Sequence, residues 1–192
     1  MPDPRPEVLD FLLSRRSRPS KTLAGPVPSR AGLMPILTAA ARSPDHGKLE
    51  PWRFVVLEKP ALHRLAGLVR TRGAALGKTP EAIDKAAKHY EHGGLAVVVI
   101  ASPKPSDKVP EIEQFYSAGA VCLALLNAAL ASGWGANWLS GWASHDRIFV
   151  AEGLGLAPHE KVAGIIHIGT ETAPPPERPR PDLDAITQWV AE

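Results

Sequence analysis

The sequence predicts a single domain of mixed helical and strand structure, without the regular alternation of a doubly wound sheet. The chain has 192 residues, of which 44% are hydrophobic, enough to bury one core alone or jointly with a second copy. Short β-branched runs are separated by segments with helical apolar spacing, without the alternation of one strand with one helix that a doubly wound sheet requires. Together these observations indicate a mixed α and β architecture with no internal repeat.

The N-terminal part is predicted to form two helices before the first strand. Residues 8–13 place apolar side chains on one side, and this pattern ends at arginines before Pro19. Residues 30–42 repeat apolar side chains at helical spacing, and Ser29 can cap their start. Residues 52–57 are aromatic and β-branched, which predicts a strand.

The middle of the chain is predicted to form two helices, a strand and a long helix. Residues 62–70 and 81–89 have helical patterns. Residues 95–101 form a Val/Ile run typical of a strand buried on both faces, which we expect at the centre of the sheet. Residues 111–132 are predicted to form one long helix, in the core or at a subunit interface, and Gly133 to end it.

The C-terminal part is predicted to end in an extended tail. A short helix is expected at residues 146–152 and a strand at 162–168. Residues 172–181 contain five prolines, which exclude regular structure. We therefore expect one domain over residues 1–192, with an extended tail from about residue 172 to the end.

Composition excludes several classes of protein. The 22 basic and 20 acidic residues leave a net charge of +2 without a long basic tract, so no nucleic-acid partner is expected. The first residues lack the pattern of a secretory signal, which predicts a cytoplasmic protein. The single cysteine, Cys122, excludes an intrachain disulfide. The apolar stretch 118–131 is too short for a membrane span, so no membrane partner is expected.

Common catalytic motifs are absent or incomplete. Residues 73–79 resemble a P-loop but have too few residues between the glycines. Residues 133–138 and 153–158 each begin like a dinucleotide fingerprint but lack the third glycine. There is no Gly-x-Ser-x-Gly elbow. His89 and His92 have no third ligand pattern, so a solvated helix end is favoured over a metal site.

Four segments concentrate residues that suit a phosphorylated aromatic ligand. Arg15, Arg16 and Ser17 can meet a phosphate, although a solvated basic patch would look the same. Residues 42–54 bring arginine, histidine, lysine and tryptophan into one turn. Residues 133–142 combine glycines with three tryptophans, which would equally suit aromatic core packing. The fourth segment, residues 178–182, presents two more arginines in an extended tail, and the alternative interpretation is a linker without a ligand.

In order and approximate spacing these segments resemble the FMN-dependent nitroreductase family, and most closely its small NAD(P)H nitroreductase subgroup. The resemblance runs from about Val8 to Asp184. The motifs that carry it are Arg15-Arg16-Ser17, Arg42 to Phe54, Lys108-Val109-Pro110, Ser117-Ala118-Gly119-Ala120 and Trp138-Leu139-Ser140-Gly141.

The resemblance implies an α+β sandwich, in which a mainly antiparallel sheet is flanked by helices and two chains intertwine as a homodimer. Two FMN molecules would lie in clefts between the subunits, with NAD(P)H as electron donor. The chain would pass hydride through FMN to nitroaromatic, quinone or similar electron-poor small molecules by a ping-pong mechanism.

The resemblance also implies that both subunits contribute to each flavin site. The cofactor-binding residues are then Arg15, Arg16, Ser17, Arg42, His46, Trp138, Leu139, Ser140 and Arg180. The first three would contact FMN from one subunit and the next two from its partner, while residues 138–140 line the ring. Arg180 in the tail, or with a weaker match Arg178, would hold the phosphate. No metal and no catalytic side chain are expected, because flavin N5 carries the reaction, with Arg16 as the candidate charge stabiliser.

Two departures from the family pattern bear on the acceptor. Glu50 stands where many relatives have Gln, and Leu139 stands where the small subgroup has Arg, so the pocket is expected to be more apolar. Two alternatives stay open: a flavin-binding protein with little turnover, and a family member with dehydrogenase or dehalogenase chemistry. The latter usually needs an inserted lid, for which the link at residues 73–80 leaves little room.

Overall fold

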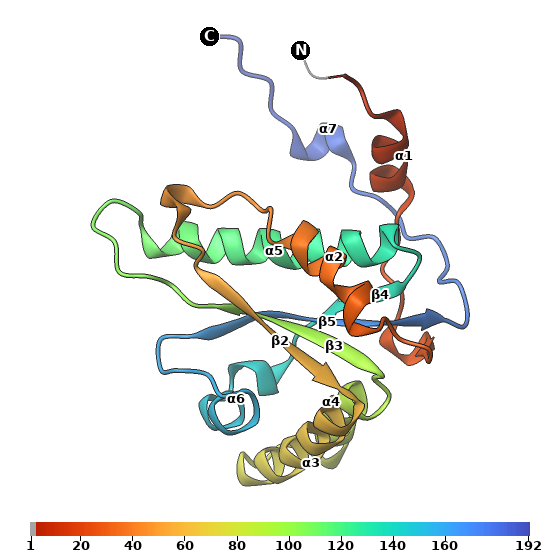
Figure 1. The fold of residues 1–192 in the computed structure, drawn as a ribbon, viewed down its shortest axis with the longest axis vertical. Coiled ribbons are helices and arrows are strands. Elements are labelled where there is room, and N and C mark those ends of the chain that lie inside the picture. Colours follow the sequence, from red (N-terminus) through yellow and green to blue (C-terminus); the bar gives the residue numbers. More distant parts are fainter. Residues whose placement is uncertain (1–2) are drawn as a thin grey trace.

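The structure, a computed structural model, describes residues 3–192 and is built around one five-stranded sheet with helices on both faces (Figure 1). The helices are α1 (Pro6–Ser14), α2 (Arg30–Ala40), α3 (Lys59–Ala75), α4 (Pro80–Glu91), α5 (Glu111–Ala131), α6 (Arg147–Leu154) and α7 (Leu183–Ile186). The strands are β1 (Leu23–Ala24), β2 (Trp52–Glu58), β3 (Leu95–Ala101), β4 (Gly135–Leu139) and β5 (Lys161–Glu171). Short 3₁₀ turns lie at Ser20–Thr22, His46–Lys48 and Trp142–His145.

The sheet is antiparallel throughout its described pairings, in the order β1-β5-β3-β2, with β4 also paired to β5. Every residue of β3 is buried, and β3 lies between β2 and β5. The prediction of an inner strand at 95–101 is therefore confirmed. The strand with most partners is nevertheless β5, which pairs with β1, β3 and β4.

The two faces of the sheet carry different helices. One face is covered by α2 and α5, and the other by α3, α4 and α6 (Figure 1). The β-branched side chains of β3 alternate between the two cores, with Val97 and Val99 on the α5 side and Val98 and Ile100 on the other. Burial on both faces explains why this strand has a continuous apolar run.

The helix ends follow from local chemistry. Ser29 caps α2, since its Oγ accepts the Gly32 N–H at 3.2 Å. Asp146 caps α6 by accepting the Phe149 N–H at 2.8 Å. Gly133 follows α5 with a φ of 83°, a left-handed conformation that favours glycine, as predicted.

Strands β4 (Gly135–Leu139) and β1 (Leu23–Ala24) were not predicted from the sequence. Five residues that include a glycine and an asparagine carry little strand propensity of their own. They form β4 because Ile165–Gly169 of β5 offers a complementary edge. Pairing over a long sequence separation, and not local preference, decides this element. Residues 172–181 form no helix or strand, and α7 follows them within the region expected to be an extended tail.

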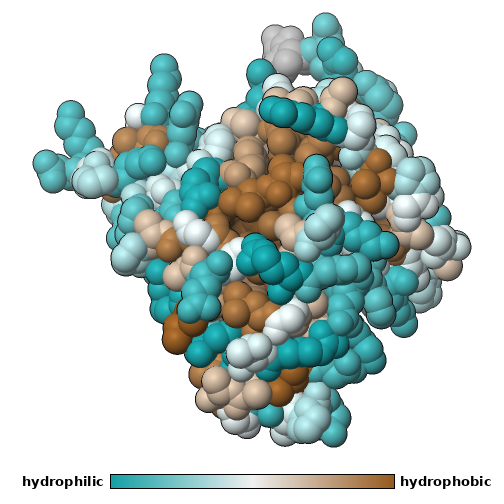
Figure 2. Space-filling model, turned by 60° about the horizontal axis from the view of Figure 1, so that its bottom comes forward, coloured by the Kyte–Doolittle hydropathy of each residue, from teal (hydrophilic) through white to brown (hydrophobic). Residues whose placement is uncertain are grey.

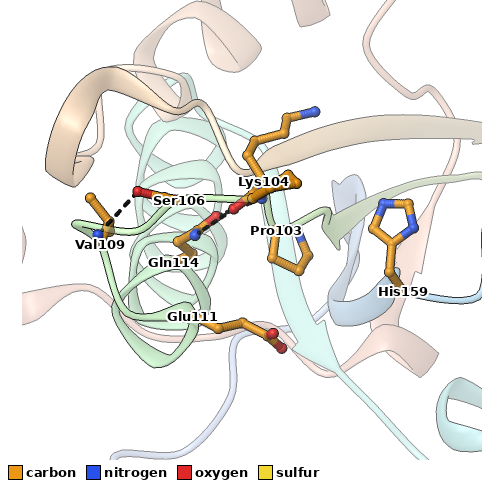
Figure 3. A pocket seen from close by; sticks show the side chains of 8 residues that line it. Pro103, Lys104, Ser106, Val109, Glu111, Gln114 and His159 are labelled. Atoms are coloured by element: carbon orange, nitrogen blue, oxygen red, sulfur yellow. Dashed lines mark hydrogen bonds between the residues drawn. The ribbon is translucent and has the colours of Figure 1, made fainter.

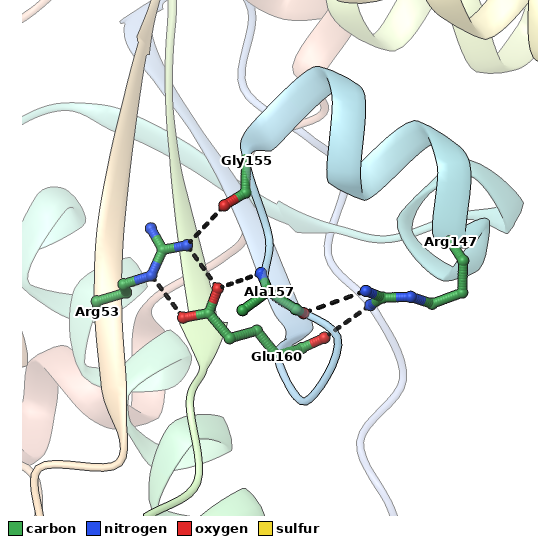
Figure 4. Close-up of polar contacts among 5 residues, drawn as sticks. All are labelled: Arg53, Arg147, Gly155, Ala157 and Glu160. Carbon is green, nitrogen blue, oxygen red and sulfur yellow. Dashed lines mark hydrogen bonds and ion pairs between the residues drawn. The ribbon is translucent and has the colours of Figure 1, made fainter.

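A buried carboxylate ties the α6–β5 loop to β2. Glu160 receives two hydrogen bonds of 2.7 Å from Arg53, through Nε and Nη2, and one of 2.9 Å from the Ala157 N–H (Figure 4). Arg147 donates to the Glu160 carbonyl at 3.0 Å. The Arg53 guanidinium is the main cause that lowers the pKa of Glu160 to about 2.

Within residues 3–192, α5 is the one helix whose length and composition would allow it to cross a membrane. The apolar stretch 118–131 was judged too short for a membrane span, whereas the whole helix, Glu111–Ala131, is long enough. The helix packs against α2 and the sheet, and its buried side chains include Val121, Leu125 and Ala129. The buried face is that of a core helix.

Two segments stand away from the sheet layers. Helix α1 and the region of α7 lie near each other at one end of the molecule (Figure 1) and bury no side chain of their own. Leu13 is 69% exposed and Trp189 is 91% exposed. A band of apolar surface with hydrophilic margins is visible on the face in Figure 2. Such surface in a folded chain typically marks an interaction site.

Candidate functional site

The arginine segment and β4 form one continuous wall. The Arg18 N–H donates to the Ala136 carbonyl at 2.8 Å, and Asn137 Nδ2 donates to the Arg18 carbonyl at 2.8 Å. The chain from Arg15 to Arg18 therefore runs along the outer edge of β4. Two segments that are more than a hundred residues apart in sequence, and that were both predicted to hold the ligand, meet here.

On one side of this wall lies a cavity of about 320 Å³, which we name the arginine pocket.

 Its lining residues are Phe11, Ser14, Arg15, Arg16, Arg18, Leu130, Gly133, Trp134, Gly135 and Glu171. Glu171 is the one acid among them, and it pairs with Arg18 at 3.2 Å. Positive charge is therefore in excess in this pocket.

Arg15 and Arg16 keep unused donors in the arginine pocket. The Nε atoms of both are buried and have no hydrogen-bond partner among the described residues. Arg15 Nη2 donates to Ser17 Oγ at 3.0 Å, and Arg16 Nη2 donates to the Pro176 carbonyl at 2.8 Å. A buried unpaired donor is costly, so this arrangement suits an anion that would accept from both guanidinium groups.

The charge cluster extends into the tail. Burial, followed by the charges of Arg180, Arg16 and Arg18, lowers the pKa of Arg15. Arg180 pairs with Glu177 at 2.9 Å, and the same carboxylate lies 4.0 Å from Arg16. The structure thus brings Arg180 to the predicted cluster, whereas only the backbone N–H of Arg178 has a described contact, to Glu177.

On the other side of the wall lies a larger cavity of about 570 Å³, which we name the α4 groove. Its lining residues are Pro19, Ser20, Lys21, Glu81, Asp84, Lys85, Lys88, His89, His92, Asn137 and Leu139. Lys88 pairs with Asp84 at 2.6 Å. Burial, and then the charge of Lys85, lowers the pKa of His89.

The contribution of α4 was missed in the sequence. His89 and His92 were interpreted as a solvated helix end, but both line the α4 groove. A signal was present, because Lys85, Lys88, His89 and His92 recur at spacings of three and four and so share one helix face. Nothing in the local sequence indicates that this face meets β4.

Residues 138–140 do not act as one surface. Trp138 pairs with Ile166 and points to the α5 side, where its indole lies against Gly164 and a Cβ on that glycine would overlap the ring. Leu139 points to the opposite face and lines the α4 groove. Ser140 follows the strand and is exposed.

The second predicted group, Arg42 and His46, lies elsewhere. Arg42 is exposed just beyond the end of α2. His46 Nδ1 is 2.6 Å from Glu113 Oε2 near the start of α5. The loop between His46 and β2 is strained, since Lys48 and Glu50 have φ values of 54° and 47°.

The two groups of predicted residues lie at opposite ends of α5. His46 contacts Glu113, whereas the arginine pocket includes Leu130 at the other end of the same helix. At about 1.5 Å per residue, these helix positions are roughly 25 Å apart. One chain therefore does not bring Arg15 and His46 to the same ligand group.

A third cavity, of about 380 Å³, lies beside the loop before α5 (Figure 3). Gln114 closes this loop by accepting from the Lys104 N–H at 2.8 Å and donating to the Lys104 carbonyl at 3.0 Å. The side chains of Lys104, Glu111 and His159 point in different directions (Figure 3). This cavity has no convergent polar groups and is not the candidate site.

Comparison with solved structures defines the class of this fold. A nitroreductase-like protein from Bacillus cereus is 21% identical, with a TM-score of 0.80 and full coverage of both chains. A nitroreductase from Desulfovibrio desulfuricans, crystallised in complex with FMN, is 20% identical, with a TM-score of 0.74 and coverage of 99% of each chain. The predicted α+β sandwich with a mainly antiparallel sheet is confirmed.

The sequence comparisons then assign the family. The model of the nitroreductase family matches residues 12–170. YdjA of Escherichia coli (strain K12), by name an NAD(P)H nitroreductase, is 35% identical over 164 residues, covering 85% of this chain and 88% of its own. A protein of Haemophilus influenzae with the same designation is 33% identical over 166 residues, with the same coverage. The chain belongs to the nitroreductase family and is an oxidoreductase.

Proposed function

We propose that this chain is an FMN-dependent NAD(P)H oxidoreductase that reduces nitroaromatic, quinone or similar electron-poor acceptors. The observation that carries the proposal is the arginine pocket, in which the buried Nε atoms of Arg15 and Arg16 have no hydrogen-bond partner among the described residues, although Glu177 Oε1 lies 4.0 Å from Arg16 Nε. A dianionic phosphate would satisfy both donors and offset the mutual repulsion of the arginines.

The two cavities along the shared wall fit the two ends of FMN. The arginine pocket suits the phosphate, with Arg180 of the tail as a further cation. The α4 groove has an apolar side chain, Leu139, an amide, Asn137, and basic groups on α4, which suits a ring with a polar pyrimidine edge. Arg16 was the predicted charge stabiliser for this edge, but its contacts with Pro176 favour a role at the phosphate end.

When bound, FMN would accept hydride from NAD(P)H and deliver it to the acceptor in a ping-pong sequence. The residues of this chain would hold the cofactor, orient it along the wall and place positive charge beside its pyrimidine edge. Asn137 is well placed for orientation, because its donation to the Arg18 carbonyl fixes its side chain. Since the pyridine nucleotides are available in the cytoplasm, we propose that the protein acts there. We also propose that residues 1–192 form a single domain.

The complete site is proposed to need a second copy of the chain. His46 lies roughly 25 Å from the arginine pocket along α5, so it cannot serve the flavin of its own subunit, and Arg42 is assigned with it to the partner's site. Antiparallel packing of two α5 helices about a twofold axis would bring each group to the pocket of the other subunit. The exposed apolar side chains of α1 and α5 support this arrangement, since a groove between them is lined by Val8, Leu12, Ala124 and Ala128.

The visible absorption spectrum of the purified protein, followed by anaerobic addition of NADH or NADPH, tests the activity. Flavin bands that bleach with either nucleotide and return with a quinone or nitroaromatic compound are the expected result. Bands that persist would favour a flavin-binding protein with little turnover. A colourless protein that takes up no added FMN would overturn the proposal.

A mixing experiment tests the shared site. Arg15→Ala and His46→Ala homodimers should each bind FMN weakly, whereas a heterodimer formed from both should contain one site with all its residues. We expect the isolated heterodimer to recover about half of the wild-type flavin occupancy, since one of its two sites is complete. No recovery in verified heterodimers would show that the two groups serve separate sites.

A further inference from the structure

A buried histidine lies behind the α4 groove. His167 of β5 is 2% exposed, and its Nδ1 is buried without a hydrogen-bond partner among the described residues. In the sheet it is opposite Asn137, which lines the groove. The ring fits against Gly93, where a Cβ would lie 3.1 Å from Nδ1.

This histidine is close enough to His89 of the groove for the charge of His89 to affect its protonation. Burial, and then the charge of His89, lowers the pKa of His167 to about 4. His167 therefore stays neutral at physiological pH, and a proton that reaches this pair goes to His89, which lies on the groove. The pKa of His89 is also below its usual range, so His89 is unprotonated at neutral pH in the empty groove.

We propose that His89 takes up a proton when the flavin in the α4 groove is reduced, and gives up that proton when the acceptor is reduced. The inference rests on the proposed function. Hydride transfer from NAD(P)H leaves NAD(P)⁺ and adds one negative charge to the flavin, and the proton bound by His89 compensates that charge. A quinone then takes the hydride and this proton, so atoms and charge balance as it becomes a hydroquinone.

The other groups that face the groove are less suited to this step. The basic groups are Lys21, Lys85, Lys88 and His92, and the acidic groups are Glu81 and Asp84. Lysine side chains are hydrogen-bond donors without an acceptor atom, so they do not supply a base. His92 is exposed, so water screens it from charge in the groove. His89 is the half-buried neutral base of the set.

The test is the pH dependence of the flavin midpoint potential in the FMN-loaded protein. For a two-electron couple, each proton taken up on reduction changes the potential by about 30 mV per pH unit. For the wild type we expect an uptake of two protons per reduced flavin, one by the flavin and one by His89, between about pH 6.5 and 8, where histidine titrates. His89→Gln should reduce the number to one, and the matched control His92→Gln should leave it at two.

His89→Lys provides a second variant, because it keeps a cation in the groove. This variant should retain flavin, and its midpoint potential should correspond to the uptake of one proton on reduction. An unchanged slope in both His89 variants, or a wild-type slope of one proton, would overturn the inference while leaving the proposed function intact. A wild type that binds no flavin would overturn the proposed function, and this inference with it.

Discussion

Replacement of Arg15 by alanine should weaken FMN binding strongly without harming the fold. In the structure its only described side-chain hydrogen bond is to Ser17, and its Nε is unpaired. The variant therefore removes little that stabilises the empty protein, and it relieves repulsion from Arg16, Arg18 and Arg180. A hydrogen bond to a charged group contributes about 1.5 to 3 kcal/mol, which corresponds to roughly 10- to 150-fold in the dissociation constant.

The assay is titration of the apoprotein with FMN, followed by quenching of flavin fluorescence, with the melting temperature of the apoprotein measured in parallel. Arg30→Ala, on an exposed arginine at the start of α2, is the matched control and should bind FMN like the wild type. Arg15→Lys should recover only part of the affinity, because lysine lacks the planar fork of donors. Equal FMN affinity in Arg15→Ala and wild type would refute the assignment of this pocket to the phosphate.

Three further predictions concern stability and the site. Glu160→Gln should lower the unfolding free energy at pH 7 by about 2 to 3 kcal/mol, and urea unfolding at several pH values should show its pH dependence. Because the folded pKa of Glu160 is depressed to about 2, its contribution is present above the unfolded value of about 4.3 and is lost as the pH falls toward 2; equal acid sensitivity of variant and wild type would contradict this. Gly164→Ala should displace the Trp138 indole at a cost of about 1 to 3 kcal/mol, seen as a shift in tryptophan fluorescence, and an unshifted spectrum would count against the contact. Glu177→Gln should strengthen FMN binding several-fold in the same titration, because its carboxylate competes for two arginines of the cluster, and weaker binding would disprove that competition.

Local sequence patterns predicted most of the helices and inner strands. Apolar periodicity indicated α2, α4 and α5, and the β-branched run indicated β3 with its observed bounds. Helix α3 extends beyond the predicted 62–70 to Lys59–Ala75, because Pro60 is tolerated in its first turn. These elements were accessible because their preferences are local or arise from burial of one continuous face.

The candidate site was only partly predictable. The arginines at 15, 16 and 180 were identified from residue type together with the resemblance to the family, and the structure brings them into one charge cluster. The basic face of α4 was not identified as part of the site. Its position opposite β4, across the α4 groove, depends on how α3, α4 and α6 cover that side of the sheet.

The sequence by itself determined the class of this protein: the order of its motifs and its apolar periodicity indicate a fold of the nitroreductase family, to which the chain belongs. Only the tertiary structure decided that residues 15–18 run along β4, that Trp138 and Leu139 face opposite ways, and that His46 lies far from Arg15. The physical reason is that composition and periodicity report local preference and burial. Pairing between distant segments is decided by packing across the whole sheet.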